Sequence, residues 1–357
     1  MLSNSVLIRD CDRPMDFTVE VFAMTRLDDD VPAPAVRRLR DTPVVSAHAV
    51  HGYGAIFNAG LVHHDGRYHL FARGVREGYV RNPEPGPRFL SYVSDVLVFE
   101  SDDGTDYRFA YVIARAGDHG VNCYEDPRIQ RVNGLGPGEF VMTYTNLPPP
   151  ESGLPWRIGA HVLNYSGGRF SIREGSGRLL GPEGVENKDS VLFDLRDGRV
   201  ALVHRIHPDI QLAVFGCLEA LWEADDDFWS AHMAELHQHT IIRPNPGALG
   251  VGAGPPPVAV DAGLLFFFHE RRSDGAYTMN IALLDHHDGR PIAVLDEALL
   301  VPELHWERFG DVDDVVFVQG AHLESDGDTI YLTYGAADRC VGAATASASH
   351  LVDLLLR

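Results

Sequence analysis

The chain has 357 residues, of which 45% are hydrophobic, and a formal net charge of −21. This length exceeds an average domain but suits one large β architecture, and the hydrophobic fraction is ordinary for a globular protein. The strong acidity argues against nucleic acid and anionic membranes as partners, because both bind to basic surfaces.

Other features of the composition bear on the compartment. No apolar run approaches the roughly 18 residues that span a bilayer, and the first residues lack the pattern of a signal peptide. The four cysteines are scattered without a C-x-x-C pair, so neither a zinc site nor a disulfide framework is indicated. We therefore expect a cytoplasmic protein with no membrane partner.

The predicted elements are almost all short strands. Residues 1–50 are irregular, and we expect them to form an N-terminal extension that packs on a single domain spanning 51–357. From residue 54 onward, paired apolar runs flank Asp-Gly turns such as Asp65-Gly66 and Asp197-Gly198, which is typical of β-hairpins. Amphipathic helix is predicted only at 218–235 and at the C-terminal end. Helix is too scarce for a parallel βαβ fold.

Small polar clusters recur where several of these strand-like runs begin. They are separated by roughly 60 to 70 residues, which is a repeat length typical of propellers and solenoids. Five such units in a ring predict an all-β, five-bladed β-propeller with a few short helices, in which the innermost strands line a central channel. Polar residues at the same point of each unit then meet in one pocket. The clusters are Asn58-Ala59-Gly60, Glu125-Asp126-Pro127-Arg128, Asn187-Lys188-Asp189, Gly254-Pro255-Pro256-Pro257 and Asp313-Asp314-Val315-Val316.

The cluster Glu125-Asp126-Pro127-Arg128 is the main candidate for chemistry, because two acids and a base stand together at a strand start. The alternative is a surface turn with a local ion pair, since an acid before proline is common in loops. Further polar groups at matching points of other hairpins favour a site. These groups are Lys188-Asp189, Arg73, His204-Arg205, His269-Glu270 and Asp338.

Other kinds of site lack support in the sequence. The chain has 18 histidines but no H-E-x-x-H or comparable spacing, so we predict no metal. Gly252-Ala253-Gly254 precedes prolines instead of a helix, which disfavours a dinucleotide or phosphate-binding loop. No G-x-S-x-G nucleophile elbow occurs. We therefore expect no cofactor.

Eight short motifs, taken in chain order, resemble glycoside hydrolase family 130, which contains β-mannoside phosphorylases and a smaller group of β-mannoside hydrolases. The resemblance runs from about Gly54 to the C-terminus. The motifs are Asn58-x-Gly60, Tyr68-His69-Leu70-Phe71-Ala72-Arg73, Glu125-Asp126-Pro127-Arg128, Lys188-Asp189 with His204-Arg205, Gly252-x-Gly254-x-Pro256-Pro257, Ile281-Ala282-Leu283-Leu284-Asp285, Glu307-x-x-Gly310 and Tyr334-Gly335-Ala336-Ala337-Asp338.

The resemblance implies a five-bladed propeller that cleaves a β-mannoside with inversion, using inorganic phosphate as co-substrate and giving α-mannose 1-phosphate. Asp126 is then the general acid, acting through the 3-hydroxyl of the mannosyl unit. No second carboxylate is required, because phosphate supplies its own nucleophilic oxygen. The phosphate-binding positions are Lys188, Arg205, His269 and Tyr277; the substrate-binding positions are Asn58, Arg73, Glu125, Arg128, Asp189 and Asp338.

Two alternatives stay open at this point. The same scaffold could hydrolyse β-mannosides with Glu186 or Glu270 as a base, or it could be a carbohydrate-binding propeller without catalysis. The acceptor sugar is also open, between manno-oligosaccharides and mannosyl-glucose or mannosyl-N-acetylglucosamine types, and we expect the loops at 76–90 and 148–156 to shape its pocket. A homo-oligomer is compatible with the sequence.

Overall fold

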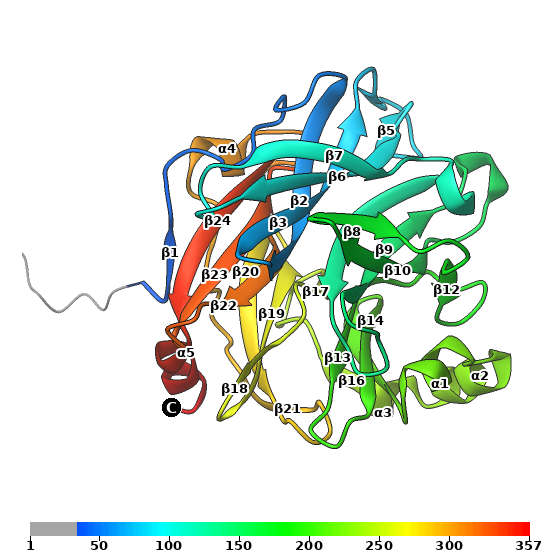
Figure 1. Cartoon of the computed structure of the whole chain (residues 1–357), viewed down its shortest axis with the longest axis vertical. Helices are drawn as coiled ribbons and strands as arrows, with labels where there is room; N and C mark the ends of the chain where they lie inside the picture. Colours follow the sequence, from blue (N-terminus) through cyan, green and yellow to red (C-terminus); the bar gives the residue numbers. More distant parts are fainter. Residues whose placement is uncertain (1–33) are drawn as a thin grey trace, which may run out of the picture. The chain divides into compact units, whose positions relative to one another are not determined.

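The computed structural model describes residues 34–357, so the prediction for residues 1–33 lies outside the described residues. Five antiparallel sheets follow one another around a ring, in the order of the sequence (Figure 1). The predicted five-bladed β-propeller is confirmed. In the first four blades the strands run outward from the central channel in sequence order, and in the fifth blade the outermost strand is β1.

The blades are built from four or five strands each. The first contains β2 (Tyr53–His64), β3 (Arg67–Arg76), β6 (Ser94–Ser101) and β7 (Arg108–Ala114). The second contains β8 (Cys123–Gln130), β9 (Glu139–Leu147), β10 (Arg157–Ser166), β11 (Arg169–Ile172) and β12 (Arg178–Leu180). The third contains β13 (Lys188–Asp194), β14 (Val200–Ile206), β15 (Asp209–Phe215) and β16 (Thr240–Ile242).

The fourth blade contains β17 (Gly250–Ala253), β18 (Val258–Val260), β19 (Gly263–Arg271), β20 (Tyr277–Leu284) and β21 (Pro291–Val294). The fifth contains β22 (Val316–Leu323), β23 (Thr329–Ala336), β24 (Cys340–Ser347) and β1 (Val36–Arg38). A separate small hairpin joins β4 (Val80–Arg81) to β5 (Phe89–Leu90). The helices are α1 (Leu218–Trp222), α2 (Asp226–Ala234), α3 (Leu236–His239), α4 (His305–Arg308) and α5 (Ala348–Leu355).

The core lies between neighbouring blades, as strand β19 shows. Its side chains alternate between the two faces of the sheet. Phe266 packs in the cluster shared with the third blade, whereas Phe267 packs in the cluster shared with the fifth. Because both faces of a blade are covered, such a strand is continuously apolar instead of alternating.

The described part of the N-terminal segment completes the fifth blade. Strand β1 pairs antiparallel with β24, so the first described strand and the last strand of the chain lie in one sheet. Arg38 then reaches the fully buried carboxylate of Glu307, with Nε–Oε1 at 2.7 Å and Nη2–Oε2 at 2.8 Å. The hydroxyl of Tyr334 donates a further 2.8 Å hydrogen bond to Glu307. This network ties β1 to α4 and β23.

A bulge interrupts the innermost strand in each of the first three blades. The pairing register shifts between Phe57 and Gly60, between Glu125 and Arg128, and between Lys188 and Val191. In each case one polar residue has a positive φ. Those residues are Asn58 (44°), Asp126 (50°) and Asp189 (50°). A bulge changes the direction in which side chains point, and a positive φ is uncommon outside glycine. The backbone at these three positions therefore departs from a regular strand.

The last two predicted clusters occupy other places. Gly254 to Pro257 lies between β17 and β18, where the inner edge of the fourth blade is broken. Asp313 and Asp314 precede β22, whose own register shift lies between Val318 and Gly320. The fifth cluster is therefore not equivalent to the other bulges, because the bulge of β22 carries Gln319 and no acid.

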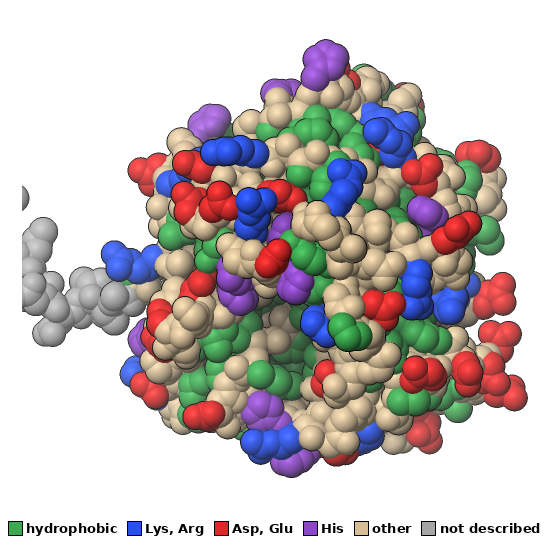
Figure 2. Space-filling model, in the orientation of Figure 1, with side chains coloured by type: hydrophobic (Ala, Val, Ile, Leu, Met, Phe, Trp, Pro, Cys, Tyr) green, Lys and Arg blue, Asp and Glu red, His purple; other side chains and the backbone are tan. Residues whose placement is uncertain are grey.

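The sequence predicted three of the five helices in residues 34–357 and missed α3 and α4. The segment at 218–235 forms α1 and α2, and the C-terminal end forms α5. None of the helices in residues 34–357 is both long and apolar enough to cross a membrane. Acidic and basic side chains are interspersed over the face shown in Figure 2, which is hollowed near its centre.

Candidate active site

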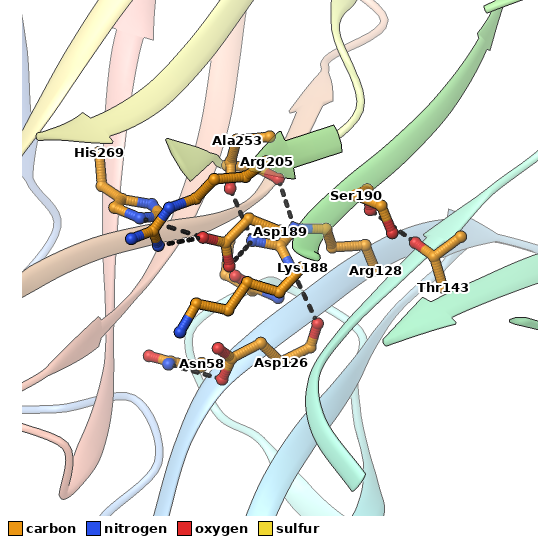
Figure 3. A network of polar contacts seen from close by, with 12 residues as sticks. Asn58, Asp126, Arg128, Thr143, Lys188, Asp189, Ser190, Arg205, Ala253 and His269 are labelled. Atoms are coloured by element: carbon orange, nitrogen blue, oxygen red, sulfur yellow. Dashed lines mark hydrogen bonds and ion pairs between the residues drawn. The ribbon is translucent and has the colours of Figure 1, made fainter. Parts of the chain in front are cut away.

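The bulges of the inner strands and the ends of the second strands bring the predicted site residues together. Asn58, Asp126 and Asp189 come from β2, β8 and β13, while Arg205 and His269 come from β14 and β19. These residues converge from different strands in Figure 3, joined by a network of hydrogen bonds and ion pairs. The network has an acidic half around Asp126 and a cationic half around Asp189.

In the acidic half, two donors hold one oxygen of Asp126. Asn58 Nδ2 donates to Asp126 Oδ1 at 2.8 Å, and Arg73 Nη1 donates to the same oxygen at 3.1 Å. Within residues 34–357 the other oxygen, Oδ2, has no hydrogen-bond partner. The carboxylate is therefore held in one orientation while one oxygen is left for a ligand.

Arg73 is held rigidly beside this carboxylate. Its guanidinium also pairs with Glu125. Its Cζ lies 4.8 Å from the ring centroid of Phe57 and 5.1 Å from that of Tyr92, which is within the range of a cation–π contact. Two aromatic rings and two carboxylates therefore fix the position of one cation.

Three carboxyl groups lie around Arg73, and their mutual repulsion favours retention of a proton. Burial raises the pKa of Asp338 to about 7; Arg73 opposes this shift and the charge of Asp126 adds to it. Burial likewise raises the pKa of Glu125, although Arg73 opposes the shift. Asp338 lies in the turn after β23 with φ of 53°. The acidic half can thus hold a proton near neutral pH.

In the cationic half, Asp189 is the common partner of several basic side chains. Arg205 Nη1 lies 2.8 Å from Asp189 Oδ2, and His269 Nε2 lies 3.6 Å from the same oxygen. Arg128 Nη2 lies 3.5 Å from Oδ1. Burial alone would raise the pKa of Asp189, but Arg205, His269 and Arg128 together hold it well below its usual range. Asp189 is therefore an ionised anchor for the cations.

Arg128 supports the site and is fully buried. Its Nε donates to Gly254 O at 2.7 Å, and its Nη2 donates to Ala253 O at 2.6 Å. Its Nη1 donates to the backbone oxygen of Asp126 at 3.0 Å. The guanidinium thus connects the inner edges of the second, third and fourth blades, and a ligand cannot reach it without moving them.

The fourth blade needs a glycine where it approaches the anchor. A Cβ placed at Gly252 would lie 2.4 Å from Asp189 Oδ2 and 2.4 Å from His269 Nε2. Real Cβ atoms do not approach other atoms so closely. Any larger residue at position 252 would therefore push the anion anchor and the imidazole apart.

Three basic side chains keep unused hydrogen-bonding capacity in the described part of the chain. His269 is 1% exposed, yet neither ring nitrogen is hydrogen-bonded. Arg205 Nε is also buried without a partner. Lys188 Nζ contacts only the Trp156 ring at 4.0 Å and the Glu186 carboxylate at 4.0 Å. Unsatisfied buried polar groups are costly, so this cluster is suited to an anion that completes it.

Burial sets the protonation states of this cluster. Burial lowers the pKa of His269 to about 3, so the imidazole is neutral and offers one N–H. Burial also lowers the pKa of Lys188. Tyr277 lies nearby, with its ring centroid 6.0 Å from that of His269, and burial raises its pKa so that the hydroxyl stays protonated. Figure 3 shows the amino group of Lys188 turned toward the side where Asp126 lies.

Of the two carboxylates considered as hydrolytic bases, Glu270 lies outside the site and Glu186 lies at the edge of its cationic half. Glu270 follows His269 on β19, so its side chain points to the opposite face of the sheet. There it accepts hydrogen bonds from Asn245 N at 2.7 Å and from Asn245 Nδ2 at 3.4 Å. Glu186 is largely exposed, and its Oε1 lies 4.0 Å from Lys188 Nζ. Neither contacts the Asp126 half in the part of the chain that the structure describes.

Several contributors to the site had no signal in the sequence. Phe57 and Tyr92 flank Arg73, and Trp156 covers Lys188. An aromatic side chain in a strand or loop does not reveal from the sequence which cation it will contact.

A separate cavity of about 380 Å³ opens between the β4–β5 hairpin and the α4 region, and none of the predicted site residues lines it. The described residues contain no group of three or more His, Cys, Asp or Glu arranged to hold a metal ion.

Comparison with known proteins gives a consistent result. The model of glycoside hydrolase family 130, described as beta-1,4-mannooligosaccharide phosphorylase, matches residues 29–357. The 1,2-beta-oligomannan phosphorylase of Thermoanaerobacter sp. (strain X514) is 28% identical over 318 residues, covering 87% of this chain and 96% of that protein.

Solved structures share the fold. The beta-1,2-mannobiose phosphorylase from Listeria innocua, in complex with beta-1,2-mannobiose, superimposes with a TM-score of 0.70 at 19% identity, over 90% of this chain and 99% of that chain. A further family 130 structure, described among glycoside hydrolases that target beta-1,2 mannosidic linkages in Candida mannan, has a TM-score of 0.64 at 17% identity, over 90% and 96%. The match of the family model over nearly the whole chain shows that this protein belongs to glycoside hydrolase family 130.

Proposed function

We propose that this protein catalyses the inverting phosphorolysis of a β-mannoside by inorganic phosphate, giving α-mannose 1-phosphate and a shortened sugar. The observation that carries the proposal is the cationic half of the site. Arg205 and His269 contact one buried anchor, Asp189, and keep buried donors without partners among the described residues. Lys188 directly precedes that anchor and adds an amino group to the set. A phosphate dianion requires such a set of donors, whereas a water molecule does not.

The acidic half suits the departure of the leaving sugar. In the proposed reaction, a phosphate oxygen attacks C1 of the mannosyl unit from one face, and the bond from C1 to the glycosidic oxygen breaks on the other. The leaving oxygen takes a proton that Asp126 supplies through the sugar's 3-hydroxyl, so Asp126 must be protonated before this step. Asn58 and Arg73 hold its carboxyl, while Asp338 and Glu125 supply further polar groups for the hydroxyls.

No second carboxylate is needed in this scheme, because phosphate brings its own nucleophilic oxygen. The position of Glu270 agrees with this. Glu270 is engaged by Asn245 on the other face of its strand. Glu186 is largely exposed and faces the amino group of Lys188. Arg128 and Asp189 act in the proposal as the buried support of the phosphate donors instead of as direct ligands of the sugar.

The substrate is tested with β-1,2-mannobiose, β-1,4-mannobiose and mannosyl-glucose. β-1,2-linked substrates come first, because the relatives named above act on 1,2-beta-oligomannan and beta-1,2-mannobiose. Initial rates are measured at increasing phosphate concentration from zero. A rate that saturates with phosphate and vanishes without it supports the proposal. A rate that is independent of phosphate overturns it.

Hydrolysis is the second candidate, because a structure described among hydrolases of beta-1,2 mannosidic linkages shares this fold. In that case water would need a base near the cationic half. The same titration separates the two reactions, since a hydrolase releases free mannose at full rate without phosphate.

A further inference from the structure

Asn187 connects the phosphate-binding residues of the proposed site to the rest of the third blade. It is fully buried and directly precedes Lys188. Its backbone N–H donates to Trp156 O at 3.0 Å, which fixes the residue whose ring covers the Lys188 amino group. Its side-chain oxygen accepts the backbone N–H of Arg205 at 3.2 Å. Asn187 therefore contacts the backbone of Arg205 and the backbone of Trp156, whose ring covers Lys188.

The hydrogen bonds around Asn187 determine the tautomers of two buried histidines. Because the backbone N–H of Arg205 can only donate, the atom that it contacts is the amide oxygen of Asn187. His204 Nδ1 lies 3.3 Å from the same oxygen and must donate to it. His204 Nε2 is then an acceptor, and His232 Nε2, at 3.0 Å, must be the donor.

The chain of hydrogen bonds ends on helix α2. His204 is fully buried and His232 is 4% exposed. His232 also stacks on His239, with ring centroids 4.0 Å apart. Burial lowers the pKa of His204 well below its ordinary value and that of His232 to about 4, so both rings are neutral. A neutral, ordered chain thus runs from α2 to Asn187.

Arg205 and Lys188 face each other across the β13–β14 pair, just before the bulge at Asp189. At this point the ladder is interrupted, and the side chain of Asn187 replaces a backbone acceptor for Arg205 N. The position of Arg205 relative to Lys188 therefore depends on Asn187 remaining in place. His204 is the group that keeps the Asn187 amide from turning.

We propose that Asn187, His204 and His232 are positioning residues for phosphate, which hold Lys188 and Arg205 at the separation that one anion requires. None of the three touches the sugar in this scheme. The inference rests on the proposed function, because it takes phosphate as the anion. It adds that the buried histidines of the third blade serve the anion half of the site alone.

His204→Gln and His204→Asn distinguish this role from simple packing. The Asn amide can place an N–H near the position of Nδ1 and so keep the bond to Asn187, whereas the Gln amide reaches toward Nε2 and loses it. A matched control is His161→Gln in the second blade. His161 is 1% exposed and hydrogen-bonds to Tyr144 OH at 3.0 Å, but it has no link to the cations.

The experiment measures the KM for phosphate, the KM for the mannoside and kcat in each variant. We expect His204→Gln to raise the KM for phosphate by about ten-fold, the value of one lost hydrogen bond, and to leave the KM for the mannoside within about two-fold. His204→Asn should recover most of this loss, and His161→Gln should change neither constant. Equal changes in both constants, or the same result for His204→Gln and His161→Gln, would overturn the inference.

Two further measurements keep the test decisive. His232→Leu removes the donor to His204 from outside the site, and it replaces His204→Gln as the test if that variant does not fold. We expect it also to raise the KM for phosphate. Phosphate-dependent stabilisation, measured as a shift in Tm, reports anion binding without turnover. If phosphate stabilises the wild type but turnover does not require phosphate, the proposed function fails. The positioning role is then measured by the loss of the phosphate-dependent shift in Tm in His204→Gln. A wild type that phosphate does not stabilise contradicts both.

Discussion

Replacing Asp338 by Asn should make the protein more stable, and the gain should grow with pH. The carboxyl of Asp338 has a folded-state pKa of about 7, because burial disfavours its charge, against 3.8 for an ordinary aspartate. Between these two values the folded protein keeps a proton that the unfolded chain has lost. The free energy of unfolding therefore falls as the pH rises through this window. The amide of Asn carries no charge and avoids this loss.

The size of the effect follows from the difference in pKa. A difference of about three pKa units corresponds to roughly 4 kcal/mol when the whole window is crossed. Asp338 is partly exposed, so solvent screening reduces this figure. We expect the difference in free energy of unfolding between Asp338→Asn and the wild type to be about 2 kcal/mol larger at pH 8 than at pH 5.

The assay is urea denaturation of both proteins at pH 5 and pH 8, with activity measured in parallel. Asp261→Asn, in the exposed turn before β19, is the control and should show the same difference at both pH values. The Asp338 variant should also lose activity, because this carboxyl is assigned to the sugar. A stability difference that does not change with pH would refute the reasoning, since it would mean that Asp338 is ionised in the folded protein throughout.

Four other substitutions test separate parts of the structure. Asp126→Asn should keep the fold and lower the rate by roughly 10² to 10⁴; activity within a few-fold of wild type would make Asp126 a structural turn residue. Arg205→Ala should raise the KM for phosphate far more than that for the mannoside, and an equal rise in both would argue for a structural role. Glu270→Gln should stay within a few-fold of wild-type activity, whereas a loss of several hundred-fold would reveal a catalytic base. Arg38→Ala should lower the free energy of unfolding by roughly 3–5 kcal/mol, because it leaves the buried Glu307 charge without its partner; a loss under 1 kcal/mol in urea denaturation would contradict this.

The sequence predicted the propeller and part of the site for a local reason. Asn58, Asp126 and Asp189 interrupt apolar runs at repeating positions, and each occupies a bulge of an innermost strand. Such a bulge can be recognised in the sequence, because a polar residue interrupts the apolar run of the strand. The same signal misled at Asp313 and Asp314, which are polar because they lie in a loop before β22.

The sequence could not predict contacts between distant segments. Arg128 was expected to bind substrate, but the structure buries it under the carbonyls of Ala253 and Gly254, more than a hundred residues away. The pairing of β1 with β24 and the bond between His204 and His232 also join separate segments. Whether a charged side chain meets a ligand or a backbone carbonyl depends on packing that no local pattern records.

The central claim is that phosphate, and not water, attacks the mannoside. The most direct test follows β-1,2-mannobiose and inorganic phosphate together by ³¹P and ¹H NMR during one incubation. We predict that inorganic phosphate is consumed and that α-mannose 1-phosphate appears in equal amount to the mannose released. Loss of mannobiose with an unchanged phosphate signal and two free mannoses per cleavage would contradict the claim.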